Sequence, residues 1–146
     1  MRVIIQRVSR ASVSVEGTTV GAIGAGLMLL VGFGKTDSFE TLKPMADKIV
    51  AMRIFSDDRG RFHASLLETK GAVLAVPQFT LYAETSKGRR PEFFDALAPE
   101  PASQLFTQFK ETLRHAGVAQ VESGVFGAYM QVELVNDGPV TITLER

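Results

Sequence analysis

Ala72-Val-Leu-Ala-Val-Pro-Gln-Phe-Thr-Leu-Tyr82 is the stretch of the chain that decides its fold. Its first five residues, Ala72 to Val76, are all apolar and predict a strand that is buried on both faces. Pro77 cannot donate a hydrogen bond to a sheet, so we expect strand pairing to weaken or end there. The stretch therefore predicts a core strand whose pairing weakens or ends at Pro77.

Two polar side chains follow this strand, Gln78 and Thr80, set between the apolar Phe79 and Leu81. If the extended backbone continues, Gln78 and Thr80 point to the same face, because side chains alternate along a strand. Buried polar groups need hydrogen-bond partners. The residues alone leave two interpretations open: the pair bonds to a neighbouring loop, or it faces a ligand.

The composition limits the class of protein. The chain has 146 residues and 45% apolar content, which is typical of one compact domain. Its 16 basic and 16 acidic residues balance, which disfavours a protein that wraps a long nucleic-acid backbone but allows one that holds a chain end. The chain has no cysteine, so disulfides and thiolate chemistry are excluded. With no signal peptide or membrane-length apolar run, we expect one cytoplasmic domain comprising residues 1–146.

The apolar periodicity predicts a mainly β protein with two helices. The helices are expected at residues 38–52 and 102–115, where apolar side chains recur at three- and four-residue spacing. Pro44 is tolerated only near a helix start, so we expect Thr41 rather than Ser38 to cap the first helix. About eight strands are expected, at residues 2–8, 11–16, 20–23, 27–33, 72–76, 118–122, 130–135 and 140–144, with a short one at 53–55.

These elements predict the α+β class: a single domain with a mostly antiparallel, barrel-like β core and two helices. Turns are expected at residues 56–60 and 136–139, where Asp, Asn, Gly and Pro gather.

Few residues offer acid–base chemistry. His115 ends the second predicted helix and His63 follows a turn, so neither has the partners of a Ser-His-Asp triad. No cluster of His and carboxylates has metal-ligand spacing, so we expect no metal and no cofactor. An enzyme with this sequence would act by positioning its substrate and by backbone donors.

Lys87, Arg89 and Arg90 form a small run of charge in a polar loop. Such runs are usually solvated surface. Beside the Gln78 and Thr80 face, however, three cations would also suit phosphate groups. Both interpretations stay open at this point.

Seven segments, taken in their order and spacing, resemble the D-aminoacyl-tRNA deacylase family in its bacterial and eukaryotic form. The likeness runs nearly from end to end of the chain. The segments are Ile5–Val13, Lys48–Val50, Arg53–Phe55, Gln78–Tyr82, Lys87–Pro91, Gly127–Met130 and Leu134–Thr141.

The resemblance implies a homodimeric hydrolase that cleaves the ester between a D-amino acid and the 3′-terminal adenosine of tRNA. Glycyl-tRNA, including glycine mischarged on tRNA(Ala), is a further family substrate. In this chain the catalytic positions are Gln78, Phe79 and Thr80. The remaining positions implied for substrate binding and chiral selection are Arg7, Pro77, Phe126, Met130, Gly138 and Pro139.

Gly138-Pro139 resembles the cis-proline element that one subunit of the family inserts into the pocket of the other, and Arg7 matches the arginine that holds it. Rigid carbonyls of this element would bind the substrate amino group and leave no room for an L side chain. Thr80 has no visible base, so we expect it to position groups while backbone donors and the ribose 2′-hydroxyl activate the ester.

One departure from the family lies next to the catalytic segment. The family usually has Ser where this chain has Pro77, which removes one hydroxyl and one N–H. This loss leaves an alternative, a non-catalytic module that binds the tRNA acceptor end. A small-molecule esterase is a third possibility, which nothing in the sequence favours.

Overall fold

The predicted core strand is β6 (Ala72–Pro77) in the computed structural model, which describes all of residues 1–146. It runs parallel to β3 (Gly26–Gly32) on one side and to β7 (Val121–Ser123) on the other. Alternate side chains of β6 enter two different apolar clusters, one on each face of the sheet. The prediction of a strand buried on both faces is confirmed.

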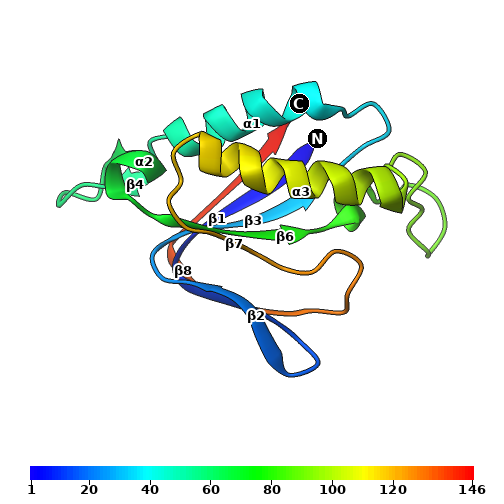
Figure 1. The fold of residues 1–146 in the computed structure, drawn as a ribbon, viewed down its shortest axis with the longest axis horizontal. Coiled ribbons are helices and arrows are strands. Elements are labelled where there is room, and N and C mark those ends of the chain that lie inside the picture. The colour runs from blue at the N-terminus through cyan, green and yellow to red at the C-terminus, as the bar shows by residue number, and fades with distance from the viewer.

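The sheet has six strands in the order β2-β1-β3-β6-β7, with β8 paired to the other edge of β1. It curves so strongly that β2 packs against β7, which gives a nearly closed, barrel-like core (Figure 1). Two short strands, β4 and β5, form a separate hairpin. The bounds of the other strands are β1 (Arg2–Val15), β2 (Thr18–Ile23), β4 (Phe55–Ser56), β5 (Phe62–Ala64) and β8 (Gln131–Glu145).

Two long helices, α1 (Phe39–Ala51) and α3 (Pro99–His115), lie side by side on one face of the sheet (Figure 1). Their apolar stripes and the sheet enclose the larger core cluster, in which Phe106 and Phe109 of α3 are fully buried. The α+β class, the barrel-like core and the eight strands are confirmed. A third helix, α2 (Leu66–Thr69), is added to the two that the sequence predicted. None of the helices has both the length and the apolar character of a membrane span.

The predicted cap of α1 is wrong. Ser38 caps the helix, because its Oγ accepts the N–H of Glu40, while the Thr41 hydroxyl donates to the Ser38 carbonyl from inside the first turn. Pro44 therefore lies inside the helix and cannot bond to the Glu40 carbonyl. Glu40 is exposed, so water can take that place.

Two pairs of predicted strands are each one continuous strand. The segments at 2–8 and 11–16 form β1, and those at 130–135 and 140–144 form β8, because the first half of β1 pairs with the second half of β8 and the second half of β1 with the first half of β8. The shorter strands are displaced from their predicted ranges: β4 begins at Phe55 and β7 at Val121. Helix α3 begins at Pro99, three residues before its predicted start.

The predicted turn at residues 136–139 is a bulge in β8. Gln6 pairs with Thr141 and Val8 with Asn136, so residues 137–140 lie opposite Arg7 alone. A strand with extra unpaired residues bends there and pushes them out of the ladder. The bulge carries Gly138 and Pro139, both exposed, and the peptide bond between them is cis.

Candidate active site

A mostly apolar cleft of about 620 Å³ opens where the parallel strands β3 and β6 end. Ligand sites are commonly found beyond the carboxyl ends of such strands. Four segments of the chain build its walls: the strand ends, the start of the helix that follows β6, the start of α3, and the loop before β8. The lining residues are Val31, Phe33, Val76–Phe79, Phe93, Ala96–Pro99, Ala102, Phe126–Met130 and Val132.

Beyond Pro77 the chain leaves the sheet. The N–H of Gln78 donates to the Val31 carbonyl (2.7 Å), and the next residues form the 3₁₀-helix η1 (Phe79–Tyr82). Extended backbone does not continue to Thr80, because η1 turns the chain away from the ladder, so the condition for a shared face of Gln78 and Thr80 is not met. The Gln78 side-chain amide instead donates to the Thr80 hydroxyl. Gln78 and Phe79 line the cleft, whereas Thr80 is exposed and lies outside its lining.

Pro77 fits the sheet at this position because one of the two neighbouring strands, β7, has already ended. The last pairing of β6 with β7 joins Ala75 to Ser123, and the N–H of Gly124 then donates to the Ala75 carbonyl (2.9 Å). No ladder bond of β7 would reach residue 77, so the missing N–H costs no sheet pairing. Pro77 lines the cleft close to Gly124, where an added Cβ would lie 3.6 Å from the proline Cδ.

Three side chains fix the far end of η1. Arg2 donates to the Leu81 carbonyl (3.0 Å), and its guanidinium lies 4.5 Å from the centre of the Tyr82 ring. The Tyr82 hydroxyl donates to Asp37 Oδ2 (3.3 Å), which also accepts the N–H of Gly34 (2.6 Å). The backbone that carries Gln78 and Phe79 is therefore tied to β1 and to the loop before α1.

Tyr82 predicts a pH dependence of stability. Burial, reinforced by the nearby charge of Asp37, raises the pKa of Tyr82 from 10 to about 12. Between these two pH values the folded protein holds a proton that the unfolded chain has lost, so stability falls as the pH rises through this window. In Tyr82→Phe this loss is absent. Urea unfolding at about pH 9 and about pH 11 should show a smaller fall for the variant than for the wild type, and equal falls would contradict the prediction.

Arg7 is buried and holds the β8 bulge from behind. Its Nε donates to the Asp137 carbonyl (2.7 Å), and its Nη1 donates to the Ile54 carbonyl (2.6 Å) and to the Ser56 hydroxyl (3.1 Å). The residue before Gly138 is thus tied to the β4–β5 hairpin. Gly138 and Pro139 themselves do not line the cleft of their own chain.

The other predicted site residues divide between the cleft and the surface. Phe126 and Met130 line the cleft, as does the highly exposed Tyr129 between them. Lys87, Arg89 and Arg90 lie outside it in an exposed loop.

The sequence analysis missed one whole wall of the cleft. This wall runs from Phe93 to Ala102 and comprises a turn and the start of α3. Pro99 at the first helical position is a known start signal and could have placed the helix correctly. No local signal links the turn to residues 33–35, to which it is joined by backbone hydrogen bonds, because the two segments lie far apart in the sequence.

The lining limits the chemistry of the cleft. It contains no His, Lys, Arg, Asp, Glu, Ser or Thr side chain, and Gln78 and Tyr129 are its polar members. No group of three or more His and carboxylate side chains in the chain could hold a metal ion. The cleft can therefore enclose an apolar or aromatic ligand and present backbone groups, but it lacks a side chain that could act as a strong base.

Comparison with known proteins identifies the family. The D-Tyr-tRNA(Tyr) deacylase family model matches residues 4–145. A D-aminoacyl-tRNA deacylase of Roseiflexus castenholzii is 54% identical over 99% of this chain and 92% of its own length. One of Bacillus velezensis is 50% identical over 99% of this chain and 98% of its own length.

Two solved structures share the fold. The c-Myc DNA Unwinding Element Binding Protein is 40% identical, with a TM-score of 0.93 over 100% of this chain and 99% of that chain. A probable eukaryotic D-amino acid tRNA deacylase is 22% identical, with a TM-score of 0.87 over 98% of this chain and 97% of that chain, and this likeness concerns the fold alone.

Fold and cleft define an α+β protein with an apolar pocket that is poor in acid–base groups. The chain belongs to the D-Tyr-tRNA(Tyr) deacylase family. The resemblance and the enzyme class that the sequence predicted, a hydrolase of this family, are confirmed.

Proposed function

We propose that this protein hydrolyses the ester that joins a D-amino acid to the 3′-terminal adenosine of tRNA, in the cytoplasm, as a step of translation quality control. Glycyl-tRNA is proposed as a further substrate. One observation carries the proposal: a chain that matches deacylases over 99% of its length places Gln78 and Phe79 on the wall of a cleft large enough for a nucleoside. Membership in the family supports the proposed reaction, and the cleft supports the proposed position of the active site.

The cleft would hold the adenine ring and the aminoacyl group. Its aromatic and aliphatic walls suit a base, which can stack on any π face. The first N–H groups of a helix have no partner within it, so those of Phe79 and Thr80 can donate to the ester carbonyl as charge develops on its oxygen. The ribose 2′-hydroxyl of the substrate then orients the attacking water and relays its proton to the leaving 3′-oxygen, since no lining side chain can act as a base. In this scheme Thr80 orients Gln78 through their hydrogen bond.

Chiral selection is assigned to Gly138 and Pro139 of a second copy of the chain. Both residues are exposed on the β8 bulge and lie outside the cleft of their own chain, so they can act only on a neighbouring one. Their carbonyls would bind the substrate amino group and leave room for hydrogen but not for an L side chain at the α-carbon. This assignment makes the active form a homodimer whose site lies at the subunit interface, with Pro77, Phe126 and Met130 as the facing wall.

Hydrolysis of three esters tests the proposal. We expect the protein to hydrolyse D-tyrosyl-tRNA and glycyl-tRNA and to spare L-tyrosyl-tRNA. Because Thr80 acts here through Gln78, Thr80→Ala should lower kcat by roughly tenfold, and Thr80→Ser should restore it. A loss of several orders of magnitude in Thr80→Ala would instead assign the chemical step to its hydroxyl.

A non-catalytic module that binds the tRNA acceptor end is the second candidate. The lack of a base in the cleft favours it, and so does the name of the 40% identical structural relative, which describes a protein that binds DNA. Survival of all three esters, together with measurable binding of uncharged tRNA, would establish this candidate and remove the deacylase proposal.

A further inference from the structure

The loop between Glu84 and Glu92 is rooted at the rim of the cleft. The two residues exchange backbone hydrogen bonds (2.8 and 3.0 Å), which close the loop into a narrow hairpin. It begins two residues after η1 and ends immediately before Phe93, a residue of the cleft wall. The Phe93 and Phe79 rings meet edge to face, with 5.0 Å between their centres. Both ends of the loop are therefore fixed to the wall that carries Phe79.

The loop presents three cations without partners. Lys87, Arg89 and Arg90 are exposed, and none of them makes a side-chain hydrogen bond or an ion pair in the structure. The loop also holds two carboxylates, Glu84 and Glu92, at its base, and Glu84 accepts the N–H of Ser86 (2.6 Å). The three cations outnumber them and lie between them in the sequence. In a protein with a formal net charge of zero, this is a local concentration of free positive charge.

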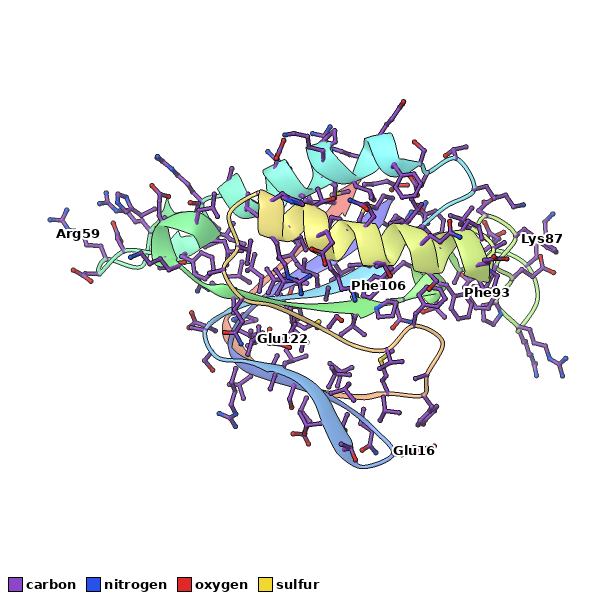
Figure 2. All side chains as sticks on the ribbon, viewed as in Figure 1. Glu16, Arg59, Lys87, Phe93, Phe106 and Glu122 are labelled. Carbon is purple, nitrogen blue, oxygen red and sulfur yellow. The ribbon has the colours of Figure 1, made fainter.

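An exposed aromatic residue follows the loop in the sequence. Phe94 directly follows Phe93 and is 69% exposed, although a phenylalanine normally avoids water. Figure 2 shows Lys87 and Phe93 at the same end of the molecule, where α3 begins, and Arg59 at the opposite end. Unpaired cations and an exposed aromatic ring at one end of a molecule can together hold single-stranded nucleic acid, because phosphates pair with the cations and bases stack on the ring.

The distance between loop and cleft fits the next nucleotides of the same strand. A chain extends at most about 3.5 Å per residue, so the loop tip lies within roughly 15 Å of the rim. Long Lys and Arg side chains add to this reach. A strand whose terminal adenosine occupies the cleft must leave it across the rim, and on this side of the rim the cations would be within reach of its preceding phosphates.

We propose that loop 84–92 and Phe94 form a second binding site, which holds the single-stranded nucleotides that precede the terminal adenosine of the substrate tRNA. The inference rests on the proposed function and adds a site to it. The ligand chemistry is a flexible phosphodiester with unstacked bases. Two of the three cations are arginines, whose planar fork matches phosphate oxygens better than a point charge does. The site would raise affinity for the tRNA without contacting the ester.

The test compares two substrates with the same ester, D-tyrosyl-tRNA and 3′-O-D-tyrosyl-adenosine, which lacks the preceding nucleotides. The variant Lys87→Ala/Arg89→Ala/Arg90→Ala should raise KM for the tRNA about tenfold or more and lower the slope of log affinity against log salt by about two. Both kinetic constants for the adenosine ester should be unchanged. Phe94→Ala should raise KM for the tRNA at least about fivefold, again with no effect on the adenosine ester.

A control variant removes the same number of cations from the end of α1 and the segments around β4, which do not line the cleft. Lys48→Ala/Arg53→Ala/Arg59→Ala has the same net charge as the loop variant, and its three side chains are exposed. Equal effects of the two variants would show a general electrostatic attraction and overturn the proposed site. An unchanged KM for the tRNA in the loop variant would overturn it as well, and so would equal losses with both substrates.

Failure of the proposed function gives a different pattern. If the wild type hydrolyses neither ester, the deacylase proposal falls, and the loop is judged by binding alone. Fluorescence anisotropy with an oligoribonucleotide that copies the single-stranded 3′ end of tRNA then decides. Weaker binding by the loop variant than by the control variant supports the site, and equal binding overturns it.

Discussion

Replacing Arg7 by alanine should lower hydrolysis of D-tyrosyl-tRNA by at least about a hundredfold and the free energy of unfolding by about 3 kcal/mol. The guanidinium is buried and donates to the carbonyls of Asp137 and Ile54 and to the Ser56 hydroxyl. Alanine leaves the buried Ile54 carbonyl without a donor and opens a space behind the β8 bulge. In the proposed dimer, the bulge that selects the D-isomer then loses its fixed position.

Arg7→Lys separates charge from geometry. A lysine keeps the positive charge but has no planar fork, so it cannot bond to Asp137 and Ile54 together as the guanidinium does. We expect it to recover part of the stability and little of the activity. Ser56→Ala removes only the hydrogen bond to the Ser56 hydroxyl (3.1 Å) and should change the free energy of unfolding by about 1 kcal/mol or less. Full activity in both Arg7 variants would show that the bulge needs no support from behind.

The preference for the D-isomer over the L-isomer is a second property to measure in Arg7→Ala. If Arg7 holds Gly138 and Pro139 in place, its loss should reduce the rate ratio of D-tyrosyl-tRNA to L-tyrosyl-tRNA, because a displaced bulge no longer excludes the L side chain. A variant that merely unfolds more easily would lose both activities in proportion. Rates measured well below the unfolding temperature therefore distinguish support of the bulge from general stability.

The parts of the fold that local patterning controls could be predicted from the sequence. Strand β6 is predictable because five consecutive apolar residues followed by Pro77 are typical of a buried strand that ends, and the structure shows both features. Helix α2 was missed although its signal was present: Ser65 and Glu68 form a capping box, in which each side chain bonds to the other's backbone N–H.

Features that depend on pairing between distant segments could not be predicted locally. Gly138 and Pro139 predict a turn when they are considered locally. They form a bulge only because β8 pairs with β1 on both sides of them. The partners of Arg7 lie 47 and 130 residues away in the chain. Its role, and that of Gly138 and Pro139, came from the family resemblance, and the structure adds the contacts through which Arg7 can exert it.

The proposed catalytic segment also depends on a glycine of the neighbouring strand β3. Gly32, at the end of β3, lies directly against the backbone of Gln78: an added Cβ would be 2.8 Å from the Gln78 carbonyl oxygen and 3.2 Å from the Leu81 Cβ. Real Cβ atoms do not approach other atoms so closely, so a larger residue must push the start of η1 away from the sheet. Because the Gln78 N–H is bonded to Val31 at 2.7 Å, this shift strains or breaks that bond.

We therefore expect Gly32→Ala to lower kcat about ten- to a hundredfold, because a displacement of an ångström or less is sufficient to misplace catalytic groups. Overpacking should also lower the free energy of unfolding by about 1–3 kcal/mol. Gly24→Ala is the matched control, since a Cβ there has no neighbour within 4 Å and its backbone is not left-handed. It should change neither quantity appreciably. A fully active Gly32→Ala would show that the backbone at Gln78 can move without loss, which would argue against this segment as the place where the ester is activated.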